Sequence, residues 1–198
     1  MLPDPSARAE YVDAFRKLAL RIAETLKQVP AADLPIKMFV AGGAALHFYT
    51  GERVSRDIDA HFSHRVALPE DLEISYKDAD GAARLLYFDR QYNGTLSLMH
   101  EDAQDDSLPL SLEGIDARVL DVRLLAPLDL AVSKISRFSE QDRADIASLA
   151  RHQPFRSTDL RRRAQEALSG YVGDLDRVNG SIDLACRIVE DMARRRPP

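Results

Sequence analysis

The chain has 198 residues, of which 45% are hydrophobic and 30% charged, with one cysteine and no tryptophan. This length is enough to bury a sizeable core, and the composition is ordinary for a globular protein. No apolar run approaches the ~20 residues needed to span a bilayer, and the N-terminus has no signal-like pattern. We therefore expect a cytoplasmic protein with no membrane partner. The single cysteine, Cys186, excludes an internal disulfide and is predicted to be a buried thiol.

The net charge of −5 is unevenly distributed. Residues 1–150 carry −8, whereas residues 151–198 carry +3, from ten arginines against seven acidic residues. A basic end can contact RNA, but few aromatic residues accompany these arginines. The default interpretation is a solvated helix face with some pairing to Asp159 and Glu166. The arginines concerned are Arg151, Arg156, Arg161, Arg162 and Arg163.

The first predicted element is an amphipathic helix. Asp4-Pro5 forms its expected cap and first turn, and apolar residues then recur every three or four positions from Tyr11 to Leu26. Pro30 follows, so the helix is expected to end before it.

Strands are predicted through the middle of the sequence. Ile36 to Ala41 and Asp57 to Phe62 have strand patterns, and a short helix from Ala44 to Tyr49, stopped by Gly51, lies between them. Shorter strands separated by Asp-Gly, Asn-Gly and Glu-Gly turns follow. They are Leu72 to Tyr76, Arg84 to Phe88, Leu96 to His100 and Arg118 to Leu124. We expect one mixed sheet of five or six strands.

From Pro127 the apolar period becomes helical. Ser139 and Asp142 resemble a capping box that opens a helix through Ala150, and two more amphipathic helices are predicted from Ser157 to Leu168 and from Ser181 to Ala193. The last residues are expected to fray. The fold prediction is α+β, with a mixed-sheet core and N-terminal helix in residues 1–126 and a helical subdomain in residues 127–198. The apolar stripe after Pro127 is predicted to be Leu128, Ala131, Val132, Ile135 and Phe138.

Residues 38 to 62 carry the strongest functional signal. An apolar strand ends in Gly42-Gly43, where backbone N–H groups can meet a phosphate at the start of a helix. Asp57 and Asp59 flank Ile58, and in a continuous strand they point to the same face. Such a pair favours a divalent cation between the carboxylates, although a tight turn and two solvated charges are the simpler alternative. Metal beside phosphate predicts nucleotide chemistry.

Gly42-Gly43 followed by Arg53-Val54-Ser55-Arg56-Asp57-Ile58-Asp59 resembles the polymerase-beta-like nucleotidyltransferase superfamily. The pattern is most similar to the AbiEii-like and MNT-like branches found in bacterial toxin–antitoxin and phage-defence modules. The similarity spans residues 36 to 150 and includes an AbiEii-like set of a lysine, an arginine and an Asp-x-x-Asp pair. That set is Lys134, Arg137, Asp142 and Asp145.

This resemblance implies a Mg²⁺-dependent enzyme that transfers a nucleoside monophosphate from an NTP to a hydroxyl. Asp57 and Asp59 would hold the metal. Lys134 and Arg137, three residues apart on a helix, would clamp phosphates, unless they are only a polar helix face. The residues expected to bind the phosphates are Gly42, Gly43, Arg53, Ser55, Arg56 and Arg137.

Many members of the superfamily use a third carboxylate, and the sequence leaves its identity open. Asp142 and Asp145 are preferred as catalytic residues together with Lys134, although Asp142 could equally be a helix cap. Asp102, expected at the end of the Leu96 to His100 strand, ranks above Asp121.

The acceptor could be a tRNA end, a protein side chain or a small molecule, and a cognate toxin or antitoxin protein is a further expected partner. A rival interpretation is a non-catalytic nucleotidyltransferase-like subunit that binds a nucleotide or a partner protein, as an antitoxin or regulatory module would. The five histidines show no ligand spacing, so zinc is not expected.

Overall fold

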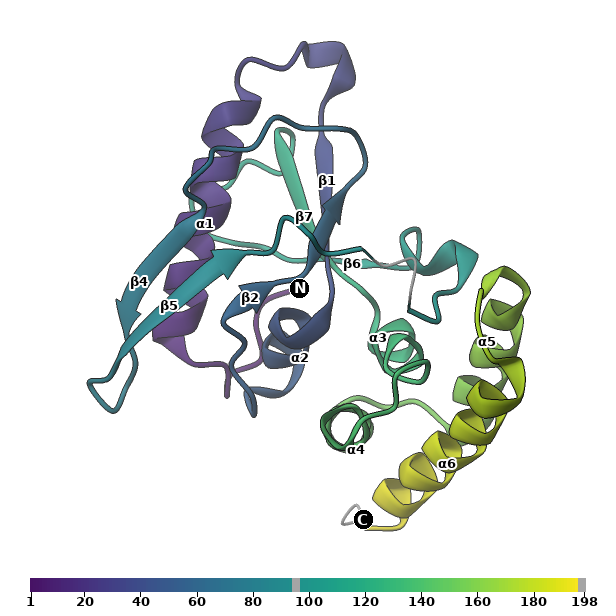
Figure 1. Cartoon of the computed structure of the whole chain (residues 1–198). Helices are drawn as coiled ribbons and strands as arrows, with labels where there is room; N and C mark the ends of the chain where they lie inside the picture. The colour runs from purple at the N-terminus through teal and green to yellow at the C-terminus, as the bar shows by residue number, and fades with distance from the viewer. Residues whose placement is uncertain (94–96, 196–198) are drawn as a thin grey trace. The chain divides into compact units, whose positions relative to one another are not determined.

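The computed structural model describes residues 1–93 and 97–195 (Figure 1). It contains two compact units. The first, called here the sheet unit, consists of Met1–Tyr92 and Ser107–Leu124, and the second, the helical unit, consists of Asn93–Asp106 and Leu125–Pro198. An N-terminal helix, mixed sheets and a C-terminal helical region confirm the α+β prediction. The domain boundary expected after residue 126 stays a prediction.

Helix α1 spans Ala9–Leu26 and buries its apolar stripe against strands β4 and β5 of the sheet unit (Figure 1). It begins later than the predicted cap at Asp4-Pro5. The Asp4 carboxylate instead accepts a hydrogen bond from the Ser6 N–H at 2.9 Å, and the Asp4 N–H donates to the Phe48 carbonyl at 2.9 Å. These contacts fix a turn before the helix, whose N-cap is Arg8.

The larger sheet has the strand order β3-β1-β7-β6. Its strands are β1 (Ile36–Val40), β3 (Ala60–Phe62), β6 (Leu108–Pro109) and β7 (Leu120–Leu124). Strand β1 pairs in parallel with β7 and antiparallel with β3, and it is buried except at Lys37. Burial on both faces explains why β1 reads as an apolar run in the sequence.

The smaller sheet has the order β2-β5-β4, with β2 at Asp57–Ile58, β4 at Glu73–Lys77 and β5 at Ala83–Phe88. A turn with Gly81 at φ +80° joins β4 to β5. The prediction of one sheet is therefore wrong. The expected strand from 57 to 62 is divided at Asp59, because β2 pairs with β5 whereas β3 pairs with β1.

Two further strand predictions differ from the structure. Residues 97–100 form no strand, and Leu96 lies outside the described residues. This stretch belongs to the helical unit, where Leu98 is fully buried and the short helix η3 (Glu101–Ala103) follows. Strand β6 was not predicted because it is only two residues long and contains a proline, which suits an edge strand.

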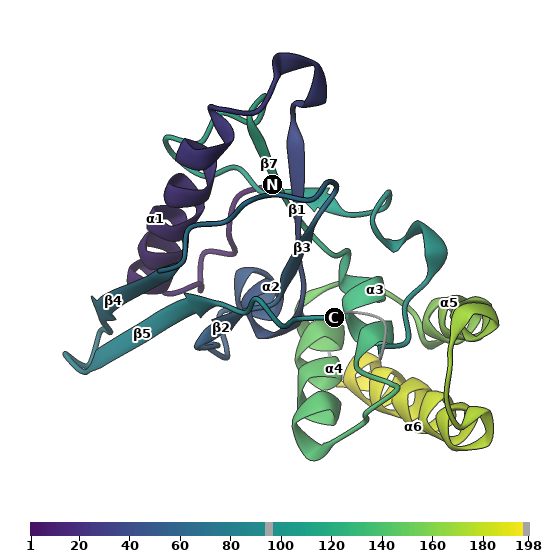
Figure 2. The ribbon, with the colours of Figure 1, turned by 45° about the horizontal axis from the view of Figure 1, so that its top comes forward.

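The helical unit contains four α-helices in its described part, and Figure 2 shows them in a second view. They are α3 (Pro127–Ser133), α4 (Glu140–His152), α5 (Ser157–Ala167) and α6 (Leu175–Arg194). Helix α6 packs against α4 and α5, and α3 also packs against α4 and α5. Helix α6 begins before the predicted Ser181, because Asp174 caps it by accepting from the Arg177 N–H at 3.0 Å. Residues 196–198 of the predicted tail lie outside the described residues.

The predicted stripe after Pro127 is only partly right. Leu128 and Phe138 are only half-buried, and Phe138 lies beyond the end of helix α3 at Ser133. The buried apolar residues of this stretch are Leu130, Ala131, Val132 and Ile135. None of the described helices has the length and apolar composition needed to cross a membrane.

Candidate functional site

The candidate site is built around the start of helix α2, which spans Gly42–Thr50 and directly follows strand β1. The structure confirms the predicted short helix and its end at Gly51, and extends its start to the two glycines. Gly42 has φ +59°, a left-handed conformation that disfavours any residue with a Cβ atom. A Cβ atom there would also lie 2.7 Å from the carboxyl carbon of Asp59. Gly42 is thus required both by its conformation and by the closeness of this carboxylate.

Gly42 and Asp59 form part of a group called here the cradle, to which Gly43 adds three more residues. A Cβ atom at Gly43 would lie 2.8 Å from the Ser55 hydroxyl oxygen and 2.9 Å from Nη2 of Arg53. The Ser55 hydroxyl in turn donates a short hydrogen bond to the Asp57 carboxylate. The structure therefore brings Arg53, Ser55 and Asp57 to the same helix N-terminus as Asp59.

The two carboxylates arrive there by a different route from the one predicted. They do not alternate along one strand, because Asp59 lies between β2 and β3, where the chain passes from one sheet to the other. The Ala41 N–H donates to the Asp59 carbonyl at 2.8 Å, which ties this crossing point to the residue before α2. Sheet switching, rather than strand alternation, places both carboxylates beside the glycines.

Tyr11 of helix α1 adds a group that the sequence did not reveal. Its side chain is fully buried, and its hydroxyl has no hydrogen-bond partner among the described residues. Burial raises the pKa of the Tyr11 hydroxyl above its usual range, and the negative charges of Asp57 and Asp59 raise the pKa further. In the sequence this tyrosine is one member of an apolar helix stripe, so only the folded chain shows its position near these carboxylates.

These groups fit a magnesium ion with bound phosphates. Mg²⁺ keeps several waters and is commonly held by one or two carboxylates plus substrate phosphates. Asp57 and Asp59 supply two carboxylates, and the glycines let a ligand approach the α2 backbone closely. The buried Tyr11 hydroxyl has an unused donor for a water or a ligand oxygen. The described residues contain no cluster of three or more His, Cys, Asp or Glu side chains.

Asp121 is not brought to this cradle. It lies on β7 level with Lys37 of β1, whereas the Asp59 carbonyl accepts a hydrogen bond from Ala41, which follows β1 four residues after Lys37. At ~3.3 Å per residue, this separation is about 13 Å along the strand. Asp121 also forms an ion pair with Arg123 at 3.1 Å. Its contacts are those of a structural residue in the sheet.

Lys134 belongs to a buried ion pair in the helical unit. Its ammonium lies 3.0 Å from the Asp145 carboxylate, and the two side chains are 8% and 2% exposed. The Gln141 side chain also donates to Asp145 at 2.9 Å. The alternative prediction of a polar helix face is therefore wrong for Lys134, because its side chain is buried.

Arg137 and Asp142 form a second pair in that unit. Arg137 lies beyond the end of α3, so it does not share a helix face with Lys134 as predicted. Its guanidinium donates two hydrogen bonds of 2.7 Å to Asp142, although its own side chain is 72% exposed. Asp142 also completes the predicted capping box with Ser139. Burial alone would raise the pKa of Asp142, but the hydrogen bonds from Arg137 and Ser139 lower this pKa to about 2.

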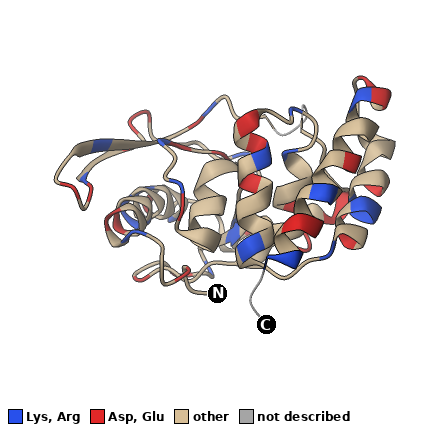
Figure 3. Ribbon diagram, turned by 90° about the horizontal axis from the view of Figure 1, so that it is seen from below, with Lys and Arg blue, Asp and Glu red and all other residues tan. Residues whose placement is uncertain are grey.

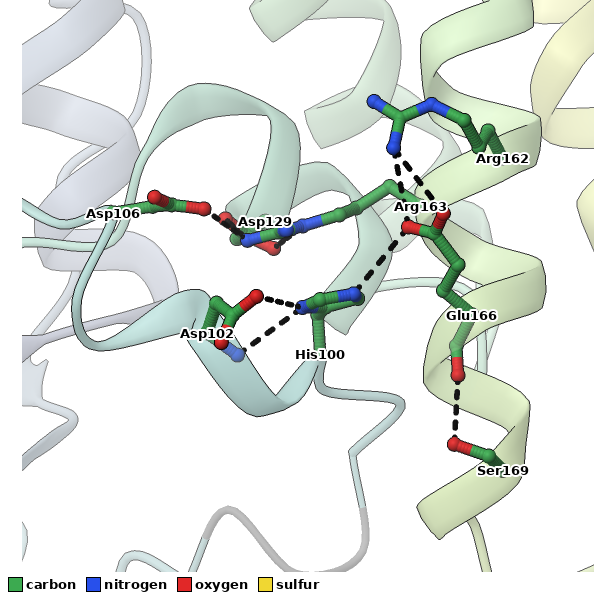
Figure 4. A network of polar contacts seen from close by, with 8 residues as sticks. All are labelled: His100, Asp102, Asp106, Asp129, Arg162, Arg163, Glu166 and Ser169. Atoms are coloured by element: carbon green, nitrogen blue, oxygen red, sulfur yellow. Dashed lines mark hydrogen bonds and ion pairs between the residues drawn. The ribbon is translucent and has the colours of Figure 1, made fainter.

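Asp102 lies on η3 rather than at a strand end, with a 59% exposed side chain. It is part of the polar network shown in Figure 4, in which His100 lies between Asp102 and Glu166. The Asp102 N–H donates to Nδ1 of His100 at 3.1 Å, and Nε2 of His100 lies 3.3 Å from the Glu166 carboxylate. Asp102 thus takes part in fastening the 97–106 segment to helix α5.

The arginines after residue 150 divide into several environments. Arg163 is buried and donates two hydrogen bonds to Asp129, at 2.8 and 2.9 Å, and one to Asp106 at 2.6 Å (Figure 4). The prediction that Arg163 lies on a solvated helix face is therefore wrong. Arg162 pairs with Glu166 at 3.2 Å as expected, and Arg161 pairs with Asp183 at 2.5 Å. Figure 3 shows basic and acidic residues interspersed along these helices. Such mixing favours ion pairing over a basic patch.

Cys186 is buried as predicted, and its Sγ donates to the Ser157 carbonyl at 3.4 Å. Burial raises the pKa of this thiol, which makes the reactive thiolate scarce at neutral pH.

Comparison with known protein families gives a match over most of the chain. Residues 17–171 match the family described as nucleotidyltransferase of unknown function (DUF6036). The match covers β1, the glycine pair and both carboxylates of the cradle, and it extends through α5. No curated protein and no solved structure matches the chain significantly.

Proposed function

Since the chain belongs to this nucleotidyltransferase family, we propose that it transfers a nucleoside monophosphate from an NTP to a hydroxyl acceptor with the help of Mg²⁺. One observation carries the proposal. Asp57 and Asp59 lie at the N-terminus of α2. A Cβ atom at Gly42 would collide with Asp59, and a Cβ atom at Gly43 would collide with Ser55, which holds Asp57. A metal-binding carboxylate pair beside a phosphate-binding helix start is the pairing that nucleotide transfer needs.

The reaction is a substitution at the α-phosphorus. A P–O bond forms to the acceptor hydroxyl oxygen, the bond to the bridging oxygen of pyrophosphate breaks, and the hydroxyl proton is released to solvent. When bound, Mg²⁺ supplies charge neutralisation at the triphosphate and the pyrophosphate leaving group.

The residues of the cradle have separate tasks in this proposal. Asp57 and Asp59 hold the metal, and the Ser55 hydroxyl keeps Asp57 oriented. Gly42 and Gly43 leave the first backbone N–H groups of α2 open to the phosphates, where the helix dipole favours negative charge.

Lys134, Asp142 and Asp145 are assigned to catalysis by resemblance alone. Their contacts within the helical unit account for them as stabilising pairs and a helix cap. The proposed chemistry therefore rests on the cradle of the sheet unit. The closer kinship to AbiEii-like and MNT-like proteins, a role in a toxin–antitoxin pair and a tRNA or protein acceptor are finer parts of the same proposal.

The test is pyrophosphate release by the full chain with each of the four NTPs, Mg²⁺ and total cellular RNA. We expect release with the parent chain and at least a 100-fold slower rate with Asp57→Asn, because the variant loses a metal ligand. Unchanged release by Asp57→Asn would refute the assignment.

A non-catalytic nucleotide-binding subunit is the second candidate. The described residues of the sheet unit offer no third acidic, histidine or cysteine ligand beside the two carboxylates, and this observation favours it. Mg²⁺-dependent NTP binding without pyrophosphate release, with RNA, protein extract and small-molecule acceptors alike, would establish that candidate.

A further inference from the structure

A pocket opens on the sheet unit next to the cradle. It has a volume of about 250 Å³ and is lined by residues from the N-terminal turn, the loop before β2 and the β4–β5 hairpin. Its polar lining consists of Arg8, Ser55, Arg56, Tyr76, Asp78 and Arg84. Ser55 is shared with the cradle, where its hydroxyl donates to Asp57. The pocket therefore begins at the residue that orients a proposed metal ligand.

The charge of this pocket is positive, because three guanidinium groups face one carboxylate. Asp78 is 3% exposed, and its Oδ2 lies 2.7 Å from Nη1 of Arg8 and 3.5 Å from Nε of Arg84. Arg84 also contacts Asp80 at 3.3 Å outside the lining. Within the lining itself, the guanidinium groups exceed the carboxylate by two charges, while Asp57, hydrogen-bonded to Ser55, and Asp80 lie just outside it.

Asp78 acts as a positioning residue for two of the guanidinium groups. Burial alone would raise the pKa of Asp78, but its hydrogen bond from the Ala79 N–H and the charges of Arg8 and Arg84 lower this pKa below its usual value. The carboxylate is thus ionised at neutral pH and holds both arginines at the pocket. Arg56 is an exposed member of the lining, and its planar group can bind an anion with two parallel hydrogen bonds.

The size and chemistry of the pocket suit part of a nucleotide. Sites for drug-sized ligands occupy roughly 300–1,000 Å³, so this smaller volume fits a phosphate with its sugar better than a whole nucleotide. Arginine forks match phosphate oxygens, and Val54, Leu85 and the half-buried Tyr76 offer apolar surface to a sugar.

We propose that this pocket binds a backbone phosphate of a nucleic-acid acceptor strand. The inference rests on the proposed nucleotidyltransferase function, because it treats the hydroxyl acceptor as a strand held beside Asp57. It also gives Arg56 a different task from the one implied by the resemblance, as a contact to the acceptor rather than to the NTP. A free nucleotide has the same phosphate chemistry, so the experiment must separate the two sources.

The experiment measures binding of a fluorescein-labelled single-stranded RNA 12-mer to the full chain by anisotropy, in EDTA and without NTP. We expect Arg56→Ala to weaken binding about tenfold, as for loss of one charge-assisted hydrogen-bonded contact, and to reduce the salt slope by about one. Arg118→Ala is the matched control. It removes the same charge from a 90% exposed side chain that precedes β7, at the opposite end of the larger sheet from α2. The control should bind like the parent.

Three outcomes would overturn the proposal. Equal binding by Arg56→Ala and the parent, or equal weakening by Arg56→Ala and Arg118→Ala, would show that the pocket holds no phosphate. Competition by ATP at the same phosphate concentration as the RNA would show that the pocket serves the nucleotide. Arg56→Lys keeps the charge and replaces Arg56→Ala if that variant fails to fold, with an expected loss of severalfold.

Two separate measurements distinguish this inference from the proposed function. They are RNA binding in EDTA by the parent and Arg56→Ala, and pyrophosphate release by the parent with Mg²⁺. Arg56-dependent RNA binding in a chain that releases no pyrophosphate would leave the pocket standing and refute only the transferase. Pyrophosphate release without Arg56-dependent RNA binding would refute the pocket assignment and leave the transferase proposal standing.

Discussion

The two units of the chain hold their acidic residues in opposite ways. In the helical unit, the predicted site has two buried carboxylates, and each lies within ion-pair distance of a cation. The pairs are Lys134–Asp145 and Arg137–Asp142. In the sheet unit, Asp57 receives a serine hydroxyl and Asp59 lies against Gly42. The first arrangement neutralises charge inside the protein, whereas the second presents oxygen atoms beside a helix N-terminus.

This difference separates residues that stabilise the fold from residues that can bind a ligand. A buried carboxylate with a fixed cation has its charge and hydrogen bonds already satisfied, and removing either partner leaves an uncompensated group. A carboxylate that lies beside a glycine-rich helix start, where no Cβ atom fills the space, is placed where a metal ion with bound phosphates can approach it. The comparison therefore predicts stability effects in one unit and ligand effects in the other.

The largest effect is expected for Lys134→Ala. This change leaves Asp145 buried without its cation, so the free energy of unfolding should fall by about 3–5 kcal/mol. Urea unfolding of the full chain measures it. Lys17→Ala is the matched control, because Lys17 and Asp13 form an exposed pair at 2.7 Å that should contribute at most ~1 kcal/mol. Lost turnover with unchanged stability would instead make Lys134 a phosphate clamp and break the comparison.

Gly42→Ala should lower NTP affinity by about 100-fold, because its Cβ would displace the Asp59 carboxylate from the site. Left-handed backbone strain adds roughly 1–2 kcal/mol of destabilisation. Gly81→Ala is the matched control, since Gly81 also has positive φ but lies in a turn with no atom within 4 Å of the added Cβ. The control should show the strain without any change in affinity. Equal affinities of the two variants for Mg–NTP would reduce the glycine pair to a turn.

Asp142→Asn should lower stability at pH 7 by about 1 kcal/mol, the usual contribution of a helix cap. Because the pKa of Asp142 is lowered from 3.8 to about 2 in the folded chain, its contribution is complete above pH ~5 and is lost as the pH falls through about 2. Unfolding curves of parent and variant between pH 7 and pH 2 should therefore converge at the acid end. A difference between parent and variant that is as large at pH 2 as at pH 7 would contradict this assignment.

The smallest effect is expected for Tyr11→Phe. Removing a buried hydroxyl that has no partner among the described residues should leave the stability unchanged or raise it by up to about 1 kcal/mol. Thermal unfolding without ligand measures this. If the hydroxyl meets a bound water or ligand oxygen, the same variant should bind Mg–NTP severalfold more weakly. A clear loss of stability without ligand would show that the hydroxyl has a structural role.

Much of the fold could be predicted from local patterns. The apolar run of β1, the stripe of α1, the Gly51 stop and the Ser139–Asp142 box each depend on neighbouring residues, and the structure confirms them. Pairing between distant segments could not be predicted in this way. The division of 57–62 between two sheets depends on which strands lie on either side, and no local pattern records this.

The candidate site shows the same limit. The glycine pair and the two carboxylates are close in sequence and carry a recognisable spacing, so the sequence was informative there. The buried ion pair of Lys134 and the position of Tyr11 were not predicted, because burial and partners become known only in the folded chain. A lysine on a helical pattern has the same sequence signature whether it faces water, a phosphate or a buried aspartate.

The most direct test of the central claim is calorimetric titration of the full chain with ATP, GTP, CTP and UTP, with and without Mg²⁺. The account predicts that at least one NTP binds in a Mg²⁺-dependent manner, and that Asp57→Asn and Asp59→Asn each abolish this binding while unfolding at the same temperature as the parent. Mg²⁺-dependent binding of equal affinity in the parent and both variants would contradict it.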